Sequence, residues 1–376
     1  MNSHLALLID PVTHHFERDR MFDPDGERGT KRRWDAELLS RWIQMRSWFQ
    51  QRGVKVHTAD CYFRGEVPAS KYVFISFGQA NRYKKVAHRQ DFVLSAFFAM
   101  ESPIVEPTQY YTRLHILQKH FKRIFTFTDI QEFAPFLRGE VRSELFHLPY
   151  MYHSIKPELW NNTDRKFLVM INHNKVPAVS WKELYTERMR AVEFFAQTNE
   201  IDLYGLGWNE PSYQLGQMWV PGTLQHIRRF FQKQWQRLNP DPLLQAARRV
   251  YRGSLPSKLE MLAQYNFALC FDNVQMNGWI TEKIFDCFVT GTIPIYWGAP
   301  DVTRYVPAPC FIDMRQFSGY AQLRSYLKSM SKQEIQQYRD HGCEYMTSEQ
   351  FRPFTPEYFT ERMKRLVEED IGISLS

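Results

Sequence analysis

The segment that decides the fold runs Tyr-Asn-Phe-Ala-Leu-Cys-Phe-Asp-Asn (265–273), Gly-Trp-Ile-Thr-Glu-Lys (278–283) and Gly-Thr-Ile-Pro-Ile-Tyr-Trp-Gly-Ala-Pro (291–300). The apolar run 267–271 predicts a strand that is buried on both faces. Thr281 can cap a helix with apolar residues on one side, and Gly291 suits the end of that helix. A second apolar strand begins at Ile293. The polar loop therefore follows a parallel strand, at the edge where open α/β sheets bind ligands.

Glu282 and Lys283 occupy the first turn of this predicted helix. The backbone N–H groups of a first turn lack helical partners and attract anions, and Lys283 adds a full positive charge, so a diphosphate fits there. Glu282 accepts hydrogen bonds and suits the hydroxyl groups of a ribose or sugar. On spacing alone the commoner interpretation is an ordinary capped helix whose Glu and Lys are solvated.

Composition predicts an ordinary soluble globular protein that is long enough for two domains. The chain has 376 residues, of which 44% are hydrophobic and 24% are charged. Its net charge of +7 favours an anionic partner such as a nucleotide diphosphate, an acidic glycan or a membrane surface. The basic residues are dispersed and no known nucleic-acid module is present, so we expect no nucleic acid partner.

The cysteine and histidine patterns indicate neither a metal site nor a disulfide framework. The five cysteines are scattered without a Cys-x-x-Cys pair, and the twelve histidines show no ligand spacing. Cys270 and Cys287 lie in apolar segments and are expected in the core. The N-terminus shows no signal peptide, and the run 92–100 is too short to span a bilayer. We therefore expect a cytoplasmic protein.

The segment 226–237 mixes basic residues with Ile, Phe and Trp at helical spacing. One interpretation is a basic amphipathic helix that contacts an anionic acceptor or the inner face of a membrane. The other, which the sequence favours, is a helix that packs on its domain and exposes a solvated basic side.

A longer motif, over residues 273–298, indicates a more specific function. Its residues are Asn273, Trp279, Thr281, Glu282 and Lys283, followed by Pro294, Tyr296, Trp297 and Gly298. This pattern resembles the signature of glycosyltransferase family 10, the inverting α-1,3/1,4-fucosyltransferases that use GDP-fucose. Two positions depart from the family pattern: Asp272 replaces Glu, and Trp279 replaces Tyr. Such changes beside a donor sugar can alter which GDP-deoxysugar is accepted.

The resemblance implies a GT-B fold, in which two Rossmann-like α/β domains face each other across a cleft. We expect an acceptor-binding domain over residues 1–152 and a GDP-sugar donor domain over residues 153–350. Residues 351–376 would form a helix that returns to the first domain. Alternating strand and helix patterns in the first 80 residues independently suggest a doubly wound domain.

The resemblance also assigns roles to residues. The run Met-Glu-Ser-Pro at 100–103 resembles the segment of the family's acceptor domain whose glutamate is proposed as the general base, which makes Glu101 the candidate. The residues implied in donor binding are Asn174, Arg188, Tyr204, Lys258, Asn273, Trp279, Glu282 and Lys283. Arg190 is an alternative to Arg188 for the contact with the diphosphate. No metal ligand is assigned, no cofactor is obligatory, and a divalent metal would at most stimulate the reaction.

The predicted function is therefore the transfer of L-fucose from GDP-β-L-fucose to a hydroxyl of an acceptor oligosaccharide or glycolipid, with inversion. An α-1,3-type linkage to a surface glycan, protein glycan or lipopolysaccharide is the first expectation. The alternatives are a transferase for another GDP-hexose or GDP-deoxysugar, and a non-catalytic protein that binds nucleotide sugars or anionic glycans.

Overall fold

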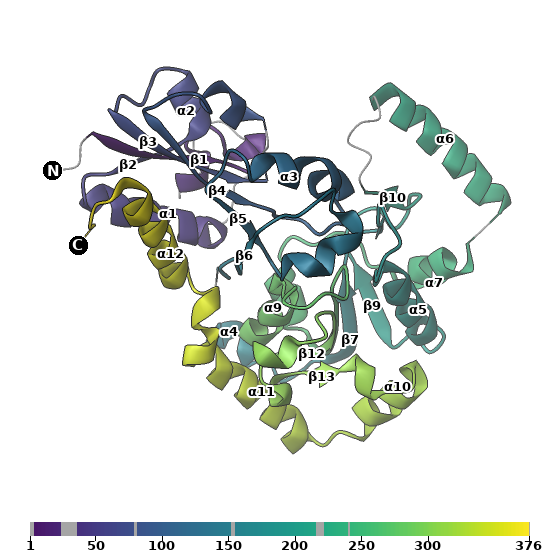
Figure 1. Cartoon of the computed structure of the whole chain (residues 1–376). Helices are drawn as coiled ribbons and strands as arrows, with labels where there is room; N and C mark the ends of the chain where they lie inside the picture. The colour runs from purple at the N-terminus through teal and green to yellow at the C-terminus, as the bar shows by residue number, and fades with distance from the viewer. Residues whose placement is uncertain are drawn as a thin grey trace. The chain divides into compact units, whose positions relative to one another are not determined.

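The protein forms two compact units, seen in a computed structural model that describes residues 4–23, 36–78, 81–151, 155–215, 222–239 and 241–375 (Figure 1). Unit 1 comprises Met1–Pro103, Thr108–Tyr152 and Arg352–Ser376. Unit 2 comprises Ile104–Pro107 and His153–Phe351. The chain thus returns to unit 1 after completing unit 2.

Unit 1 is built on a six-stranded parallel sheet with the order β2-β1-β3-β4-β5-β6. Its strands are β1 (Leu5–Asp10), β2 (Lys55–Thr58), β3 (Lys71–Phe77), β4 (Phe92–Phe98), β5 (Arg123–Thr126) and β6 (Glu144–Leu145). Every residue of β1 is buried, as expected for a central strand of a parallel sheet that is covered on both faces.

The helices of unit 1 include the last one of the chain. They are α1 (Ala36–Gln51), α2 (Ala59–Phe63), a π-helical turn (Gln109–Arg113) that leads into α3 (Leu114–Leu117), and α12 (Pro356–Ile371). Thr355 caps α12 by accepting a hydrogen bond from the Tyr358 N–H, as the sequence predicts. The ring of Trp42 in α1 meets those of Phe77 and Phe359 edge-on, so α12 completes the core of this unit.

Unit 2 is built on a five-stranded parallel sheet with the order β13-β12-β11-β7-β9. These strands are β7 (Lys166–Ile171), β9 (Ile201–Tyr204), β11 (Tyr265–Phe271), β12 (Ile293–Trp297) and β13 (Ile312–Asp313), and a separate pair joins β8 (Lys175–Val176) to β10 (Tyr213–Gln214). Phe267 pairs with Ile293 and Phe271 with Trp297, which confirms that the two apolar runs of the segment 265–300 are parallel neighbours.

Helices connect and flank these strands. They are α4 (Pro157–Trp160), α5 (Tyr185–Ala196), α6 (Gly222–Leu238), α7 (Pro242–Val250), α8 (Lys258–Leu262), α9 (Glu282–Thr290), α10 (Tyr320–Ser329) and α11 (Lys332–Met346). Cys270 and Cys287 are buried, as their apolar surroundings in the sequence predict. Within the described ranges, no helix combines the length and apolar character that crossing a bilayer requires.

The turn from α9 into β12 depends on a glycine. Gly291 ends α9 in the left-handed region (φ 66°), and its N–H and that of Thr292 bond to the last carbonyls of the helix. A Cβ at this position would lie 2.9 Å from the ring of Trp160, whose Nε1–H donates to the Phe288 carbonyl. Both the backbone conformation and the packing therefore require glycine here.

We expect Gly291→Ala to lower the free energy of unfolding of the protein by about 2–4 kcal/mol, through left-handed strain and the clash with Trp160. Gly372→Ala is the matched control, because Gly372 also ends a helix in the left-handed region (φ 73°) but has no atom within 4 Å of the added Cβ. The control should cost about 1 kcal/mol. Equal losses in the free energy of unfolding, measured with urea, would show that the contact with Trp160 does not contribute to the effect.

Candidate functional site

The centre of the site is the buried carboxylate of Asp272, which immediately follows β11 and is 0% exposed. The Thr281 hydroxyl donates to its Oδ1, and the Tyr296 hydroxyl donates to its Oδ2 at 2.8 Å. Burial raises the pKa of the Asp272 carboxyl, while the nearby Lys283 ammonium, 3.8 Å away, acts to lower it. One side chain thus links the end of β11, the start of α9 and the end of β12.

Close packing around this carboxylate explains the glycine that follows β12. A Cβ on Gly298 would lie 2.3 Å from the Tyr296 hydroxyl and 2.6 Å from Asp272 Oδ2. The same hydroxyl accepts a hydrogen bond from the Ala299 N–H at 2.9 Å. The Tyr-Trp-Gly-Ala run of the sequence is therefore shaped by the buried Asp272–Tyr296 pair.

Thr281 stands at the N-cap position of α9, but the predicted capping hydrogen bond is wrong. Its side chain accepts no hydrogen bond from a backbone N–H of the first turn, and the hydroxyl instead donates to Asp272. A buried carboxylate without donors costs more free energy than a solvent-accessible helix start without a cap. Thr281 therefore does not occupy the N–H groups of the first turn, the part of a helix that attracts anions.

Two cations approach the carboxyl end of β11. Lys283 lies with its Nζ 3.3 Å from the Thr281 hydroxyl oxygen. Arg188, in α5, is buried and donates from Nε (3.1 Å) and Nη2 (2.6 Å) to the Phe271 carbonyl. Its Nη2 also donates to Asn273 Oδ1 at 3.0 Å. Both charges therefore lie around residues 271–273.

Arg190 occupies a different environment from Arg188. Its side chain is 58% exposed and pairs with Glu187 on the same helix. Of the two arginines that the sequence left as alternatives, Arg188 is thus the one placed beside Asn273.

A second group of charges surrounds the half-exposed Glu282. Its Oε1 lies 3.7 Å from the Nζ atoms of both Lys283 and Lys258, and Lys258 also forms an ion pair with the buried Asp286. Although desolvation raises the pKa of the Glu282 carboxyl, the two lysines outweigh it and hold the pKa at about 2. Glu282 is therefore an ionised acceptor across the whole neutral range.

Asn174 and Tyr204 have other roles in this structure. The Asn174 amide donates to the carbonyls of Gly207 and Glu210 and accepts from Ser212, so it stabilises the loop after β9. The Tyr204 hydroxyl lies 3.4 Å from that of Tyr265, which begins β11. The Tyr204 hydroxyl thus contacts the residue that starts β11, whereas Asn273 follows the other end of that strand.

Trp279 and Glu101 complete the residues that the sequence singled out. Trp279 is 5% exposed, and its backbone carbonyl lies 3.5 Å from the Tyr296 hydroxyl. Glu101 lies in unit 1, three residues after the end of β4, and its carbonyl accepts a hydrogen bond from the Tyr110 hydroxyl. Three residues further along, Ile104–Pro107 groups with unit 2.

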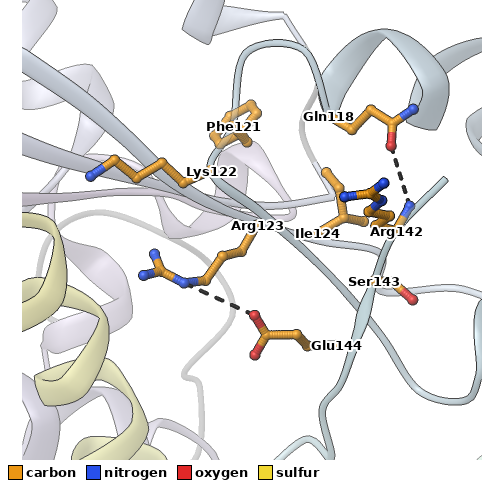
Figure 2. A pocket seen from close by; sticks show the side chains of 8 residues that line it. All are labelled: Gln118, Phe121, Lys122, Arg123, Ile124, Arg142, Ser143 and Glu144. Atoms are coloured by element: carbon orange, nitrogen blue, oxygen red, sulfur yellow. Dashed lines mark hydrogen bonds and ion pairs between the residues drawn. The ribbon is translucent and has the colours of Figure 1, made fainter.

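Two cavities of unit 1 contain none of these residues. One, of about 210 Å³, lies at the start of β5 and is lined by Gln118, Phe121, Lys122, Arg123, Ile124, Arg142, Ser143 and Glu144 (Figure 2). Figure 2 shows Arg123 turned toward Glu144, and the Arg142 N–H donates to the Gln118 side chain at 3.2 Å. The other, of about 480 Å³, lies beside His57 and Cys61.

Among the described residues, the structure brings together a cluster of possible metal ligands that the sequence spacing did not indicate. It is formed by Asp19, His57 and Cys61, whose possible ligand atoms lie within 4.8 Å of one another. The Asp19 carboxylate already accepts from His57 at 2.7 Å and pairs with Arg46 at 3.3 Å. A guanidinium nitrogen of Arg64 lies 3.2 Å from Cys61 Sγ. These guanidinium groups oppose the binding of a cation there.

Comparison with solved structures agrees with this architecture. The HepE protein (Alr3699) of Anabaena, solved with UDP and glucose, aligns with 97% of this chain and 100% of its own, with a TM-score of 0.52 and 10% identity. At this identity the likeness concerns the fold alone. The two parallel α/β units have the GT-B architecture.

Comparison with protein families points to the C-terminal part of the chain. Residues 245–363 match the model of the glycosyltransferase family 10 (fucosyltransferase) C-terminal region. The alpha-(1,3)-fucosyltransferase FucT of Helicobacter pylori is 40% identical over 75 residues, or 20% of this chain and 16% of that protein. Human alpha-(1,3)-fucosyltransferase 7 is 35% identical over 80 residues, or 20% of this chain and 23% of that protein.

The matches thus span less than a quarter of the length of these relatives. The matched region 245–363 nevertheless contains β11, α9 and β12, together with Asp272, Lys283 and Gly298. Through this part, the chain is similar to the C-terminal region of glycosyltransferase family 10.

Proposed function

We propose that this protein transfers L-fucose from GDP-β-L-fucose to a hydroxyl of an acceptor glycan, with inversion at the anomeric carbon. The observation that carries the proposal is the convergence of Lys283, Arg188 and the uncapped first turn of α9 on the carboxyl end of β11. Such an arrangement is suited to a diphosphate, because the dipole of the helix and two cations act on the same small region.

The donor would lie along α9 in this proposal. The diphosphate would meet Lys283, Arg188 and the first-turn N–H groups, and the ionised Glu282 would accept from the ribose hydroxyls. Lys258 would hold Glu282 in place, while Asn273 and Trp279 would line the sugar end of the site. Asn174 would act through the loop that it stabilises, and Tyr204 stays a prediction without support from this geometry.

Glu101 would be the general base. As the acceptor oxygen forms a bond to the anomeric carbon, the bond between that carbon and the diphosphate oxygen breaks, and GDP leaves with the electron pair. The acceptor proton passes to the Glu101 carboxylate. Lys283 and Arg188 would stabilise the charge that grows on the diphosphate, the role that a metal has in other enzymes. On this basis a divalent metal would at most stimulate transfer.

The identity of the donor is tested by incubating the protein with GDP-fucose, other GDP-hexoses and UDP-sugars, and measuring which nucleotide is released. We expect GDP release from GDP-fucose. Because Trp279 is bulkier than the Tyr of the family pattern and lacks its hydroxyl, another GDP-deoxysugar is the second candidate. Binding of GDP-sugars without release, in the presence of an acceptor panel, would instead indicate a non-catalytic binding protein.

The acceptor would be a surface oligosaccharide or a glycolipid such as lipopolysaccharide, or a glycan on protein, joined by an α-1,3-type linkage. Peripheral contact with the cytoplasmic face of a membrane through residues 226–237 is the matching proposal for its location. The net charge of +7 supports an anionic surface as partner.

Lys283→Ala should weaken GDP binding by about 10- to 100-fold, the usual value of a charge-assisted hydrogen bond to phosphate. Isothermal titration with GDP measures this change. Lys332→Ala, in the first turn of α11, is the control for removing a lysine from the start of a helix, and it should leave GDP affinity unchanged. Unchanged GDP affinity in Lys283→Ala would place the diphosphate elsewhere.

The two arginines of α5 form a matched pair. Arg188→Lys keeps the charge but loses the forked contact with the Phe271 carbonyl and Asn273, so GDP affinity should fall by about tenfold. Arg190→Lys should bind GDP normally, since its partner is Glu187. The opposite ranking of the two variants would reassign the diphosphate contact to Arg190.

Glu101→Gln should reduce the rate of transfer by about 10²–10⁴-fold, because the amide cannot accept the acceptor proton. GDP should bind the variant as it binds the native protein, since the predicted diphosphate contacts all lie in unit 2. Glu106→Gln, five residues further along, is the control for a lost carboxylate and should turn over normally. Near-normal turnover in Glu101→Gln would refute its assignment as the base.

A further inference from the structure

The helix α6 exposes its apolar residues instead of burying them. The side chains of Leu224, Ile227, Phe230, Phe231, Trp235 and Leu238 are between 53% and 80% exposed. At helical spacing they form a continuous stripe along α6, which we call the apolar stripe. In Figure 1, α6 stands apart from the five-stranded sheet of unit 2. This exposure contradicts the interpretation that the sequence favours, a helix packed on its domain by its apolar side.

The polar side of α6 makes a charged contact with the rest of unit 2. Lys233 lies on the opposite side of the helix from Phe231 and Trp235, and its ammonium bonds to both carboxylate oxygens of Glu210 at 3.1 Å. This charged contact therefore lies on the opposite side of α6 from Phe231 and Trp235 of the apolar stripe. A stripe of this size on a soluble protein marks an interaction surface.

The charge of the surrounding chain indicates what covers the stripe. Residues 211–240 contain four Lys or Arg residues and no Asp or Glu. A protein partner has no need of such uniform charge, whereas a bilayer of anionic lipids attracts it over the whole length of the segment. The residue types on the stripe, Trp and Phe with Leu and Ile, are those of helices that lie in the membrane interface.

We propose that α6 lies on the surface of an anionic lipid bilayer, with its apolar stripe inserted among the headgroups. With 17 residues the helix is about 25 Å long and carries charges along its length, so it would lie in the plane of the interface rather than cross it. The proposal makes the predicted membrane contact specific by naming the inserted side chains and the lipid charge. It does not depend on the proposed transferase activity.

The test is co-sedimentation of the full chain with vesicles of phosphatidylglycerol and phosphatidylcholine, compared with vesicles of phosphatidylcholine alone. We expect binding to the anionic vesicles and much weaker binding to the neutral ones, with a decrease as salt is raised. The variant Phe231→Ser/Trp235→Ser should lose about tenfold or more in binding, because two of the largest inserted apolar groups are removed. Both residues are more than 60% exposed, so thermal unfolding should be unchanged.

Tyr111→Ser/Ile116→Ser is the control, since these two apolar residues are 55% and 42% exposed but lie in unit 1, outside α6. It should bind vesicles as the native protein does. Equal binding by the native chain and the α6 variant, or no binding by the native chain, would overturn the proposal. So would a dimer in solution that the α6 variant dissociates, because a second copy would then cover the stripe. GDP binding, measured in parallel, should be the same in all three proteins and separates this result from the donor site.

Discussion

The constraint on which the site depends is the burial of one carboxylate. Asp272 has no access to water, so its oxygens must find donors within the protein. The hydroxyls of Thr281 and Tyr296 supply them, and the Lys283 ammonium lies close enough to offset the charge. Because these partners come from the start of α9 and the end of β12, one buried charge holds three elements in a fixed arrangement.

That arrangement has a chemical consequence. Thr281 bonds to Asp272 and does not cap the first turn of α9, so the positive end of the helix and the Lys283 ammonium lie close together. Arg188 is held to the same region by the Phe271 carbonyl. Groups positioned in advance by folding need little reorganisation when an anion binds, and the proposed diphosphate site would use this property.

The departure of Asp272 from the family pattern has a local explanation. Gly298 approaches so closely that a Cβ would lie 2.6 Å from the carboxylate, and the Tyr296 hydroxyl fills the remaining space. A side chain longer by one methylene would be difficult to place without moving the end of β12. In this chain the shorter acid, the tyrosine and the glycine therefore form one packed unit.

The sequence by itself determined the features that depend on neighbouring residues. The strand–helix–strand order of 265–300, the glycine that ends α9, the cap of α12 and the position of Lys283 in a first turn all follow from local patterns of apolar and turn residues. Tertiary structure decided which partners the individual side chains contact. Thr281 bonds to a carboxylate nine residues away, Asn174 is used by a loop, Arg188 rather than Arg190 faces β11, and the apolar side of α6 is exposed. Each of these outcomes depends on which elements meet in space, and periodicity along one helix or strand contains no information about its partner.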